Sequence, residues 1–159
     1  MDLMKRISLV KARLEELHKD VEKLRSECET SKKYVATVMK NVSDSGENFK
    51  AKFEVMREHL AIELEFMRAR IKMIHEISPA TAEKLNKFVN IHERKNRGIL
   101  RVFQAQFDGV NDPLAKEMIT KLFSDSIILD DVGISSFIDL CLFSIRDTLD
   151  RLQSMGNKS

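Results

Sequence analysis

Residues that form turns, sheets and disulfides are scarce in this sequence, and each scarcity excludes a class of structure. The 159 residues include five Gly, two Pro, one Tyr and no Trp, while 33% of them are charged. This composition is typical of long helices and argues against a sheet protein. The two cysteines, Cys28 and Cys141, are too few for a disulfide framework or a zinc site, so we interpret both as small buried hydrophobic residues.

Motifs of catalysis and of cofactor binding are missing as well. The sequence has no glycine-rich phosphate loop, no nucleophile elbow and no cluster of Cys and His ligands. Its four histidines are far apart along the chain: His18, His59, His75 and His92. We therefore expect no enzymatic activity, no cofactor, no metal ion and no small-molecule substrate.

Long apolar runs are absent too. No stretch of about 18 residues is continuously apolar, and the N-terminal residues lack the apolar run of a signal peptide. The net charge of +2 indicates neither a protein that coats nucleic acid nor a strongly acidic one. We expect an intracellular, cytoplasmic protein that has neither nucleic acid nor a membrane as a partner.

The strongest positive feature is an apolar seam over residues 3–49. Its members follow one another in alternating steps of four and three: Leu3, Ile7, Val10, Leu14, Leu17, Val21, Leu24, Cys28, Ser31, Val35, Val38, Val42, Ser45 and Phe49. This spacing is that of a coiled coil, so it predicts a long helix that pairs with another helix.

Beyond Phe49 the spacing of the apolar residues changes. They are Phe53, Met56, Leu60, Leu64, Met67, Ile71 and Ile74. Steps of four now adjoin, which moves the repeat from 7 towards 11 residues and straightens the supercoil. The two patterns together predict one coiled-coil helix over residues 1–77.

A polar stretch, Ser-Asp-Ser-Gly-Glu-Asn, interrupts the pattern at residues 43–48. Gly inside a helix costs about 1 kcal/mol relative to Ala, and Ser and Asp prefer caps and turns. A turn here would produce a helical hairpin. We favour a continuous helix because Val42, Ser45 and Phe49 stay in phase, and keep a break at 43–48 as the alternative.

Residues 78–159 are predicted to form shorter helices that fold back onto the coiled coil. Ser78 as N-cap and Pro79 as first helical residue begin a helix that runs to about residue 107. Gly109 ends that helix, and a short one follows over residues 113–123.

The last helix is predicted at about residues 135–155, after an apolar link at 127–129. It is apolar on nearly every side at first, through Phe137, Ile138, Leu140, Cys141, Leu142, Phe143 and Ile145. A helix of this kind needs burial on several faces, so we expect it to pack between the long helices.

The middle of the first fold-back helix is polar all round. It carries four basic residues: Arg94, Lys95, Arg97 and Arg101. We interpret them as a solvated face, with a basic contact for phosphate or an acidic partner as the alternative.

Charges beside the seam bear on the direction of pairing. β-branched residues at one seam position with Leu at the other favour two parallel strands. In a parallel pair, however, Arg6 would face Lys11 and Arg13 would face His18, which are repulsive or neutral contacts. Exposed pairs contribute only about 0.2 to 1 kcal/mol each. They tip the balance towards an elongated antiparallel dimer.

A heptad stretch that passes into an 11-residue repeat, followed by a proline turn and fold-back helices, resembles the coiled-coil region of tripartite-motif (TRIM) proteins. The segment Phe49–Leu64 is similar to the middle of that region. The resemblance implies an antiparallel homodimer that carries other domains at its two ends. The family's RING and B-box zinc ligands are absent from this sequence, so the chain would be only the scaffold part. Gly46 in mid-helix is a departure from the family's pattern.

We therefore expect an all-α, non-enzymatic scaffold that dimerises through a coiled coil, with another copy of itself or a related helical protein as partner. It would be the scaffold part of a ubiquitin ligase of the tripartite-motif type. The alternative is a monomeric helical-bundle adaptor that binds a partner helix or peptide in a groove. The predicted interface comprises Leu3, Ile7, Val10, Leu14, Leu17, Val21, Leu24, Val35, Val38, Phe49, Phe53, Met56, Leu60, Leu64, Met67, Phe137 and Leu142.

Overall fold

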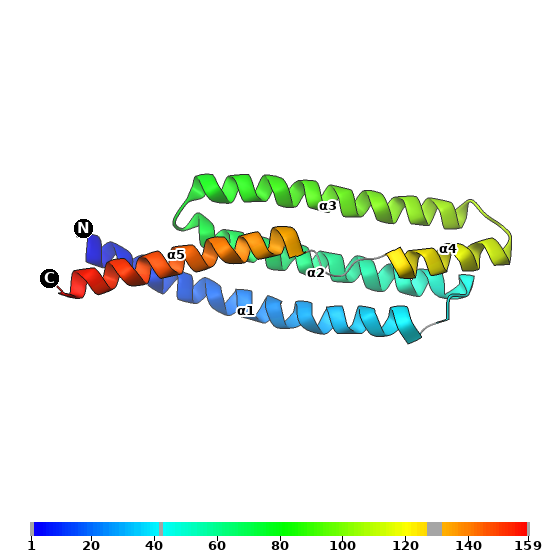
Figure 1. The fold of residues 1–159 in the computed structure, drawn as a ribbon, viewed down its shortest axis with the longest axis horizontal. Helices are drawn as coiled ribbons and strands as arrows, with labels where there is room; N and C mark the ends of the chain where they lie inside the picture. The colour runs from blue at the N-terminus through cyan, green and yellow to red at the C-terminus, as the bar shows by residue number, and fades with distance from the viewer. Residues whose placement is uncertain (1, 42, 127–131, 159) are drawn as a thin grey trace. The chain divides into compact units, whose positions relative to one another are not determined.

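The computed structural model describes residues 2–41, 43–126 and 132–158, and this part of the chain is helical without any strand. The elements in order are α1 (Leu3–Asn41), the short 3₁₀ helix η1 (Gly46–Asn48), α2 (Phe49–His75), α3 (Pro79–Asp108), α4 (Pro113–Ser126) and α5 (Val132–Lys158), as Figure 1 shows. The predicted all-α class is confirmed.

Capping chemistry places the starts of α3 and α4 where the sequence predicts them, whereas α4 ends three residues later than predicted and α5 extends over Val132–Lys158 instead of about 135–155. At the start of α3, the Thr81 amide donates to Ser78 Oγ at 3.3 Å, as an N-cap requires. At the start of α4, the Leu114 amide donates to Asp112 Oδ1 at 3.3 Å, directly before the helix. The apolar link predicted at 127–129 lies outside the described residues.

A helix continuous over residues 1–77 is not observed. Helix α1 ends at Asn41 and α2 begins at Phe49, so the break at 43–48 that the sequence left as the alternative is what the structure contains. The Asn48 side chain donates to the Ser43 carbonyl at 2.9 Å, and the Asn48 amide donates to the Ser45 carbonyl at 3.0 Å. These local bonds satisfy backbone groups that a helix would otherwise use.

The chain divides into two compact units. The first unit comprises Met1–Arg25, Glu65–Asn90 and Asp131–Ser159, and the second comprises Ser26–Leu64 and Ile91–Asp130. Helices α1, α2 and α3 contribute residues to both units, whereas α4 belongs to the second unit and α5 to the first.

The core of the second unit is rich in phenylalanine. The Phe49 ring stacks on Phe107, with centroids 4.2 Å apart and planes 9° apart. Phe123 of α4 lies 5.4 Å from Phe49 and meets Phe103 edge-on at 5.1 Å. Val35 of α1 is buried in the same cluster. Four helical segments therefore share one core, because α1, α2, α3 and α4 each supply a side chain.

The first unit has an aliphatic core. Its buried apolar residues come from four helical segments: Ile7, Leu14, Leu17, Val21, Phe66, Met67, Ile71, Met73, Ile74, Ala82, Leu85, Val89, Ile138, Leu142 and Leu149. At its surface, Lys11 of α1 donates to Asp150 of α5 at 2.8 Å, and the ribbons of these two helices cross in Figure 1.

The prediction that the last helix packs between the long helices and is buried on several faces is wrong. Its inward side chains, Ile138, Leu142 and Leu149, are buried, but Phe137, Leu140 and Phe143 are 54%, 65% and 70% exposed. Helix α5 packs with one face on its unit, and the apolar residues of its opposite face remain at the surface.

Candidate functional site

An open groove of about 460 Å³ lies between α2 and α3 in the second unit. Its apolar lining consists of Phe53 from α2 and Leu100 and Ala105 from α3. Leu100 is buried and Phe53 is half-buried, so the floor is part of the core of the unit. A groove of this size with a firm apolar floor can accept side chains of another molecule.

Three arginines line the same groove: Arg57 of α2 and Arg97 and Arg101 of α3. Arg57 pairs with Glu54 at 2.6 Å and Arg97 pairs with Glu93 at 3.5 Å, each within its own helix. Arg101 has no ion pair within the part of the chain that the structure describes. Such exposed pairs contribute little and exchange readily, so all three guanidinium groups can bind another anion.

The acidic residue of the groove is Asp108, near the end of α3. Both of its carboxylate oxygens accept hydrogen bonds from Gln104 Nε2 at 3.0 Å. The groove therefore carries its positive charge on the three arginines and a carboxylate at Asp108.

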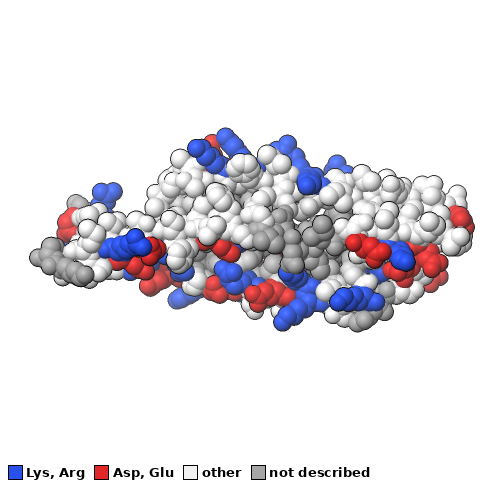
Figure 2. Space-filling model, viewed as in Figure 1, with Lys and Arg blue, Asp and Glu red and all other residues white. Residues whose placement is uncertain are grey.

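The structure separates the four basic residues that the sequence singled out. Arg97 and Arg101 line the groove, whereas Arg94 and Lys95 are exposed on α3 outside it. Figure 2 shows Lys and Arg gathered along α3 with few acidic side chains among them. Exposure of Arg94 and Lys95 is compatible with both the solvated and the contact interpretation, and both interpretations stay open for all four residues.

Most residues of the predicted interface are covered by the chain itself. Ten are buried: Ile7, Leu14, Leu17, Val21, Val35, Val38, Phe49, Met56, Met67 and Leu142. Five are half-buried: Val10, Leu24, Phe53, Leu60 and Leu64. Leu3 and Phe137 are exposed. The seam therefore packs mainly against helices of its own chain.

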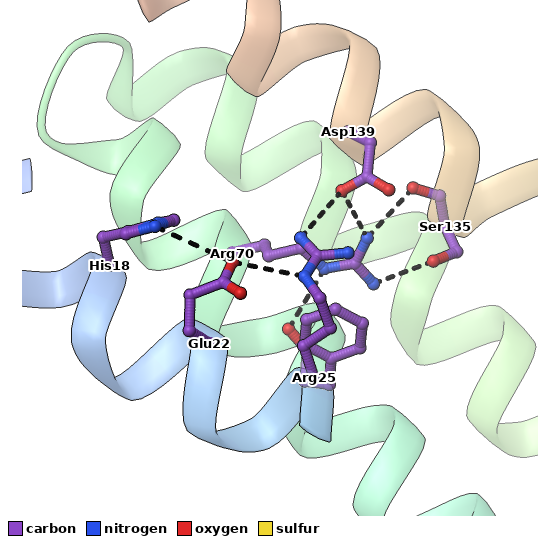
Figure 3. Close-up of polar contacts among 7 residues, drawn as sticks. His18, Glu22, Arg25, Arg70, Ser135 and Asp139 are labelled. Carbon is purple, nitrogen blue, oxygen red and sulfur yellow. Dashed lines mark hydrogen bonds and ion pairs between the residues drawn. The ribbon is translucent and has the colours of Figure 1, made fainter. Parts of the chain in front are cut away.

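A buried arginine organises the polar interior of the first unit (Figure 3). Arg70 of α2 is 0% exposed, and its guanidinium lies 3.8 Å above the Phe66 ring centroid. It donates to the Ser135 carbonyl at 3.1 Å, to Ser135 Oγ at 2.9 Å and to Asp139 Oδ1 at 2.9 Å. These contacts attach the beginning of α5 to α2.

Residues of α1 join this cluster. Arg25 lies 3.9 Å from Asp139 Oδ1 and 3.2 Å from Glu22, and its guanidinium is 5.0 Å from the Phe66 centroid. Figure 3 shows Arg25 and Arg70 approaching Asp139 from two different helices. The single carboxylate thus serves two cations, and the cluster binds three helices together.

A second buried cation lies in the second unit. Lys52 of α2 is 0% exposed, and its Nζ donates to Asp44 Oδ1 and to Ser124 Oγ, both at 2.7 Å. The hydrogen bond from Lys52 lowers the pKa of the Asp44 carboxyl below its usual value, against a smaller opposing effect of burial. This ion pair connects the turn after α1 to α4.

Two histidines in the second unit share one carboxylate. His59 Nε2 lies 3.4 Å from Glu63 Oε2, and His92 Nε2 lies 3.8 Å from Glu63 Oε1. His59 Nδ1 is 3.0 Å from Ser31 Oγ, and Nε2 is buried without a hydrogen bond. In a catalytic triad the serine contacts Nε2 and the carboxylate contacts Nδ1, which is the reverse of this arrangement. The His59 ring is also only 1% exposed.

These polar clusters were missed by sequence reasoning. Arg70, Lys52 and His59 are buried although they lie outside the apolar seam, where the pattern predicts no inward side chain. One signal was present, because Asp139 interrupts the apolar run of the last helix and an acidic residue in such a place needs a cation. Neither cysteine forms a disulfide, and both are half-buried.

The outer face of α4 carries a second apolar feature. Leu114, Met118 and Leu122 follow at steps of four and are 63%, 66% and 54% exposed. Steps of four place the three side chains on one side of the helix. We call them the α4 stripe. Glu117 and Lys121 are exposed on the same helix.

Comparison with known proteins returns no relative: no family model, no curated protein and no solved structure matches this chain. Among the described residues, no helix combines the length and the apolar character that crossing a membrane requires. The same residues contain no group of three or more His, Cys, Asp or Glu side chains that could hold a metal ion.

Proposed function

We propose that this chain is a non-enzymatic helical-bundle adaptor that binds a helix or peptide of another protein in the groove between α2 and α3. The observation that supports this most directly is the groove itself, with its core-supported apolar floor and its row of arginines. Grooves between helices that accept an apolar helix face are a recurrent mode of peptide recognition.

The burial of the seam favours the adaptor over a dimer formed along the seam. Leu14, Leu17 and Val21 are each 6% exposed or less within one chain, so a second helix has no access to them. A partner must use surfaces that remain open, of which the groove is one.

The test uses amphipathic peptides of about 15 residues, long enough for a helix of about four turns. Each has Leu on one face and either Glu, Lys or Gln on the other, and binding is followed by fluorescence anisotropy. Ala105→Trp fills the groove from the exposed edge of α3, whereas Ala51→Trp adds the same bulk at an exposed position of α2 outside it.

At least one peptide series should bind the wild-type chain and the Ala51→Trp variant but not the Ala105→Trp variant. Equal binding to all three proteins would place the peptide elsewhere on the surface. Absence of binding in every series would refute the adaptor.

The second candidate is a dimerising scaffold, and the α4 stripe is the observation in its favour. Two copies of α4 that run antiparallel about Met118 would bring Leu114 of each copy near Leu122 of the other. Lys121 of each copy would then come within reach of Glu117 of the other, which makes the contact self-complementary. The resemblance to tripartite-motif proteins implies a dimer along the coiled coil, so the α4 contact is a separate proposal that the resemblance does not support.

Light scattering distinguishes the two candidates. A dimer formed by the α4 stripe should become a monomer in the double variant Met118→Glu with Leu122→Glu. It should stay a dimer in the matched control Ile99→Glu with Val102→Glu, which introduces the same two charges at exposed apolar positions of α3. A monomeric wild-type chain would leave only the adaptor.

A further inference from the structure

We infer that the occupant of the groove between α2 and α3 is an acidic peptide segment, in which an apolar side chain is accompanied by two carboxylates about one helical turn apart. The inference rests on the proposed adaptor function and specifies the chemistry of its partner. Its basis is the charge of the groove and the spacing of its arginines.

The spacing of the arginines in the groove sets the spacing that we expect for the carboxylates of the bound peptide. Arg97 and Arg101 are four residues apart on α3, so they lie about 6 Å apart along the helix axis. Carboxylates at positions i and i+4 of a bound helix have the same separation. Each guanidinium can hold a carboxylate by two parallel hydrogen bonds, which a Lys cannot do.

The floor defines the apolar part of the occupant. Phe53 and Ala105 are partly exposed beside the arginines, above the buried Leu100, so a segment that binds only by charge would leave this apolar surface in water. A Leu, Ile or Phe side chain between the two carboxylates would cover the floor. The groove is open along its length, which suits a peptide better than a small molecule that needs enclosure on most sides.

Nucleic acid fits these features less well than a peptide. Two of the arginines already have acidic neighbours, Glu54 and Glu93, which repel a carboxylate as well as a phosphate, but a phosphate backbone carries a negative charge at every unit along the groove. Asp108 adds a third carboxylate at the groove. A peptide can avoid this residue by presenting a neutral or basic side chain there.

The experiment compares two charge-reversed proteins that differ only in position. Arg97→Glu with Arg101→Glu reverses two charges in the groove, and Arg94→Glu with Lys95→Glu reverses two exposed charges on the same helix outside it. The probes are the Leu/Glu peptide described above, a Leu/Gln peptide of the same pattern, polyglutamate and a single-stranded oligothymidine. Circular dichroism verifies that both variants keep the wild-type helix content.

The Leu/Glu peptide should bind the wild-type chain at least about tenfold more tightly than the Leu/Gln peptide does, because two charge-assisted contacts are gained. The groove reversal should remove this preference, and the control reversal should preserve it. Polyglutamate should bind more weakly than the Leu/Glu peptide, because it has nothing to cover the floor.

Three results would overturn the inference. Equal losses in the two reversed proteins would mean that only the general charge of α3 matters. Tighter binding of polyglutamate or of oligothymidine would mean that the floor is not used. Preference for the Leu/Gln or Leu/Lys peptide, still sensitive to Ala105→Trp, would leave the adaptor intact while refuting an acidic partner.

Discussion

At the scale of single residues, two buried cations connect helices inside the cores, as apolar side chains do elsewhere in them. Arg70 and Lys52 are both 0% exposed, yet each has a carboxylate and a hydroxyl as hydrogen-bond partners. A buried charge is tolerated only with such partners, because its removal from water is otherwise costly. Each cation also reaches a helix far away in the sequence, so these contacts specify which helices pack together.

Truncation of Arg70 should be among the most destabilising single changes. Arg70→Ala removes the hydrogen bonds to Ser135 and Asp139 and the contact with the Phe66 ring, and it leaves a cavity, so we expect a loss of about 3 kcal/mol in the free energy of unfolding. Asp139→Asn should cost less, about 1 kcal/mol, since that side chain is 46% exposed. Urea denaturation followed by circular dichroism measures both.

Arg68→Ala is the matched control for this prediction. Arg68 lies two residues away on the same helix, is exposed and donates to Asn90 at 3.0 Å. Its loss should change stability by about 0.5 kcal/mol or less. If Arg68→Ala and Arg70→Ala were equally destabilising, the buried cluster would not be a special source of stability.

At the scale of the elements, the turn between α1 and α2 depends on an ion pair that responds to pH. Lys52 lowers the pKa of Asp44 in the folded chain, so the carboxylate contributes stability above the unfolded-state pKa of about 3.9. That contribution is lost as the pH falls through the lower, folded-state pKa. Because the Asp44 side chain is 38% exposed, solvent screens the pair, and Asp44→Asn should destabilise the chain at neutral pH by only about 0.5 to 1 kcal/mol. The effect of the substitution should shrink as the pH is lowered from neutral through that folded-state pKa.

Urea midpoints of the wild-type chain and of Asp44→Asn across this pH range provide the measurement. Asp112→Asn is a useful comparison, because Asp112 caps α4 and has no cationic partner among the described residues. A constant difference between wild type and Asp44→Asn at every pH would show that the ion pair with Lys52 contributes nothing.

Two glycines should respond in opposite directions to the same substitution. A Cβ at Gly98, inside α3, would meet nothing within 4 Å, so Gly98→Ala should stabilise the chain by about 1 kcal/mol through helix propensity. A Cβ at Gly46, in η1, would come within 2.9 Å of Lys116 Cβ on α4. Gly46→Ala should destabilise, because the backbone of one element must move. Thermal unfolding measures the change in stability of the two variants. If both substitutions stabilised the chain, the close packing of η1 on α4 would be contradicted.

Helix boundaries were predictable wherever local chemistry sets them. Ser78 and Pro79, and likewise Asp112 and Pro113, carry their capping function in adjacent residues, and the structure begins α3 and α4 there. At residues 43–48 the phase of the seam predicted a continuous helix, whereas the turn-forming residues predicted a break. The break is observed, and the apolar residues keep their spacing because the helices on both sides of the turn pack on one core. The surroundings of Arg70 and the groove between α2 and α3 could not be predicted, since both depend on helices distant in sequence.

At the scale of the whole molecule, the question is whether the seam forms the core of one chain or the interface between two chains. Leu17 is 6% exposed within its unit, whereas Leu3, a member of the same seam, is 61% exposed. If the seam is part of the core of one chain, an aspartate at Leu17 places a charge in that core and should cost about 4 kcal/mol or more, enough to unfold most of the protein. Leu3→Asp should leave the fold intact.

Circular dichroism and light scattering on the same samples test this distinction. We expect Leu17→Asp to lose helix content without passing through a folded species of lower mass, and Leu3→Asp to keep both its helix content and the mass of the wild-type chain. A seam that joins two chains predicts a dimeric wild-type chain, which Leu17→Asp would convert to a folded monomer of half that mass or to an unfolded chain. That result would mean that the helices covering Leu17 in one chain can be replaced by those of another, and the coiled-coil dimer would then be the better account of this protein.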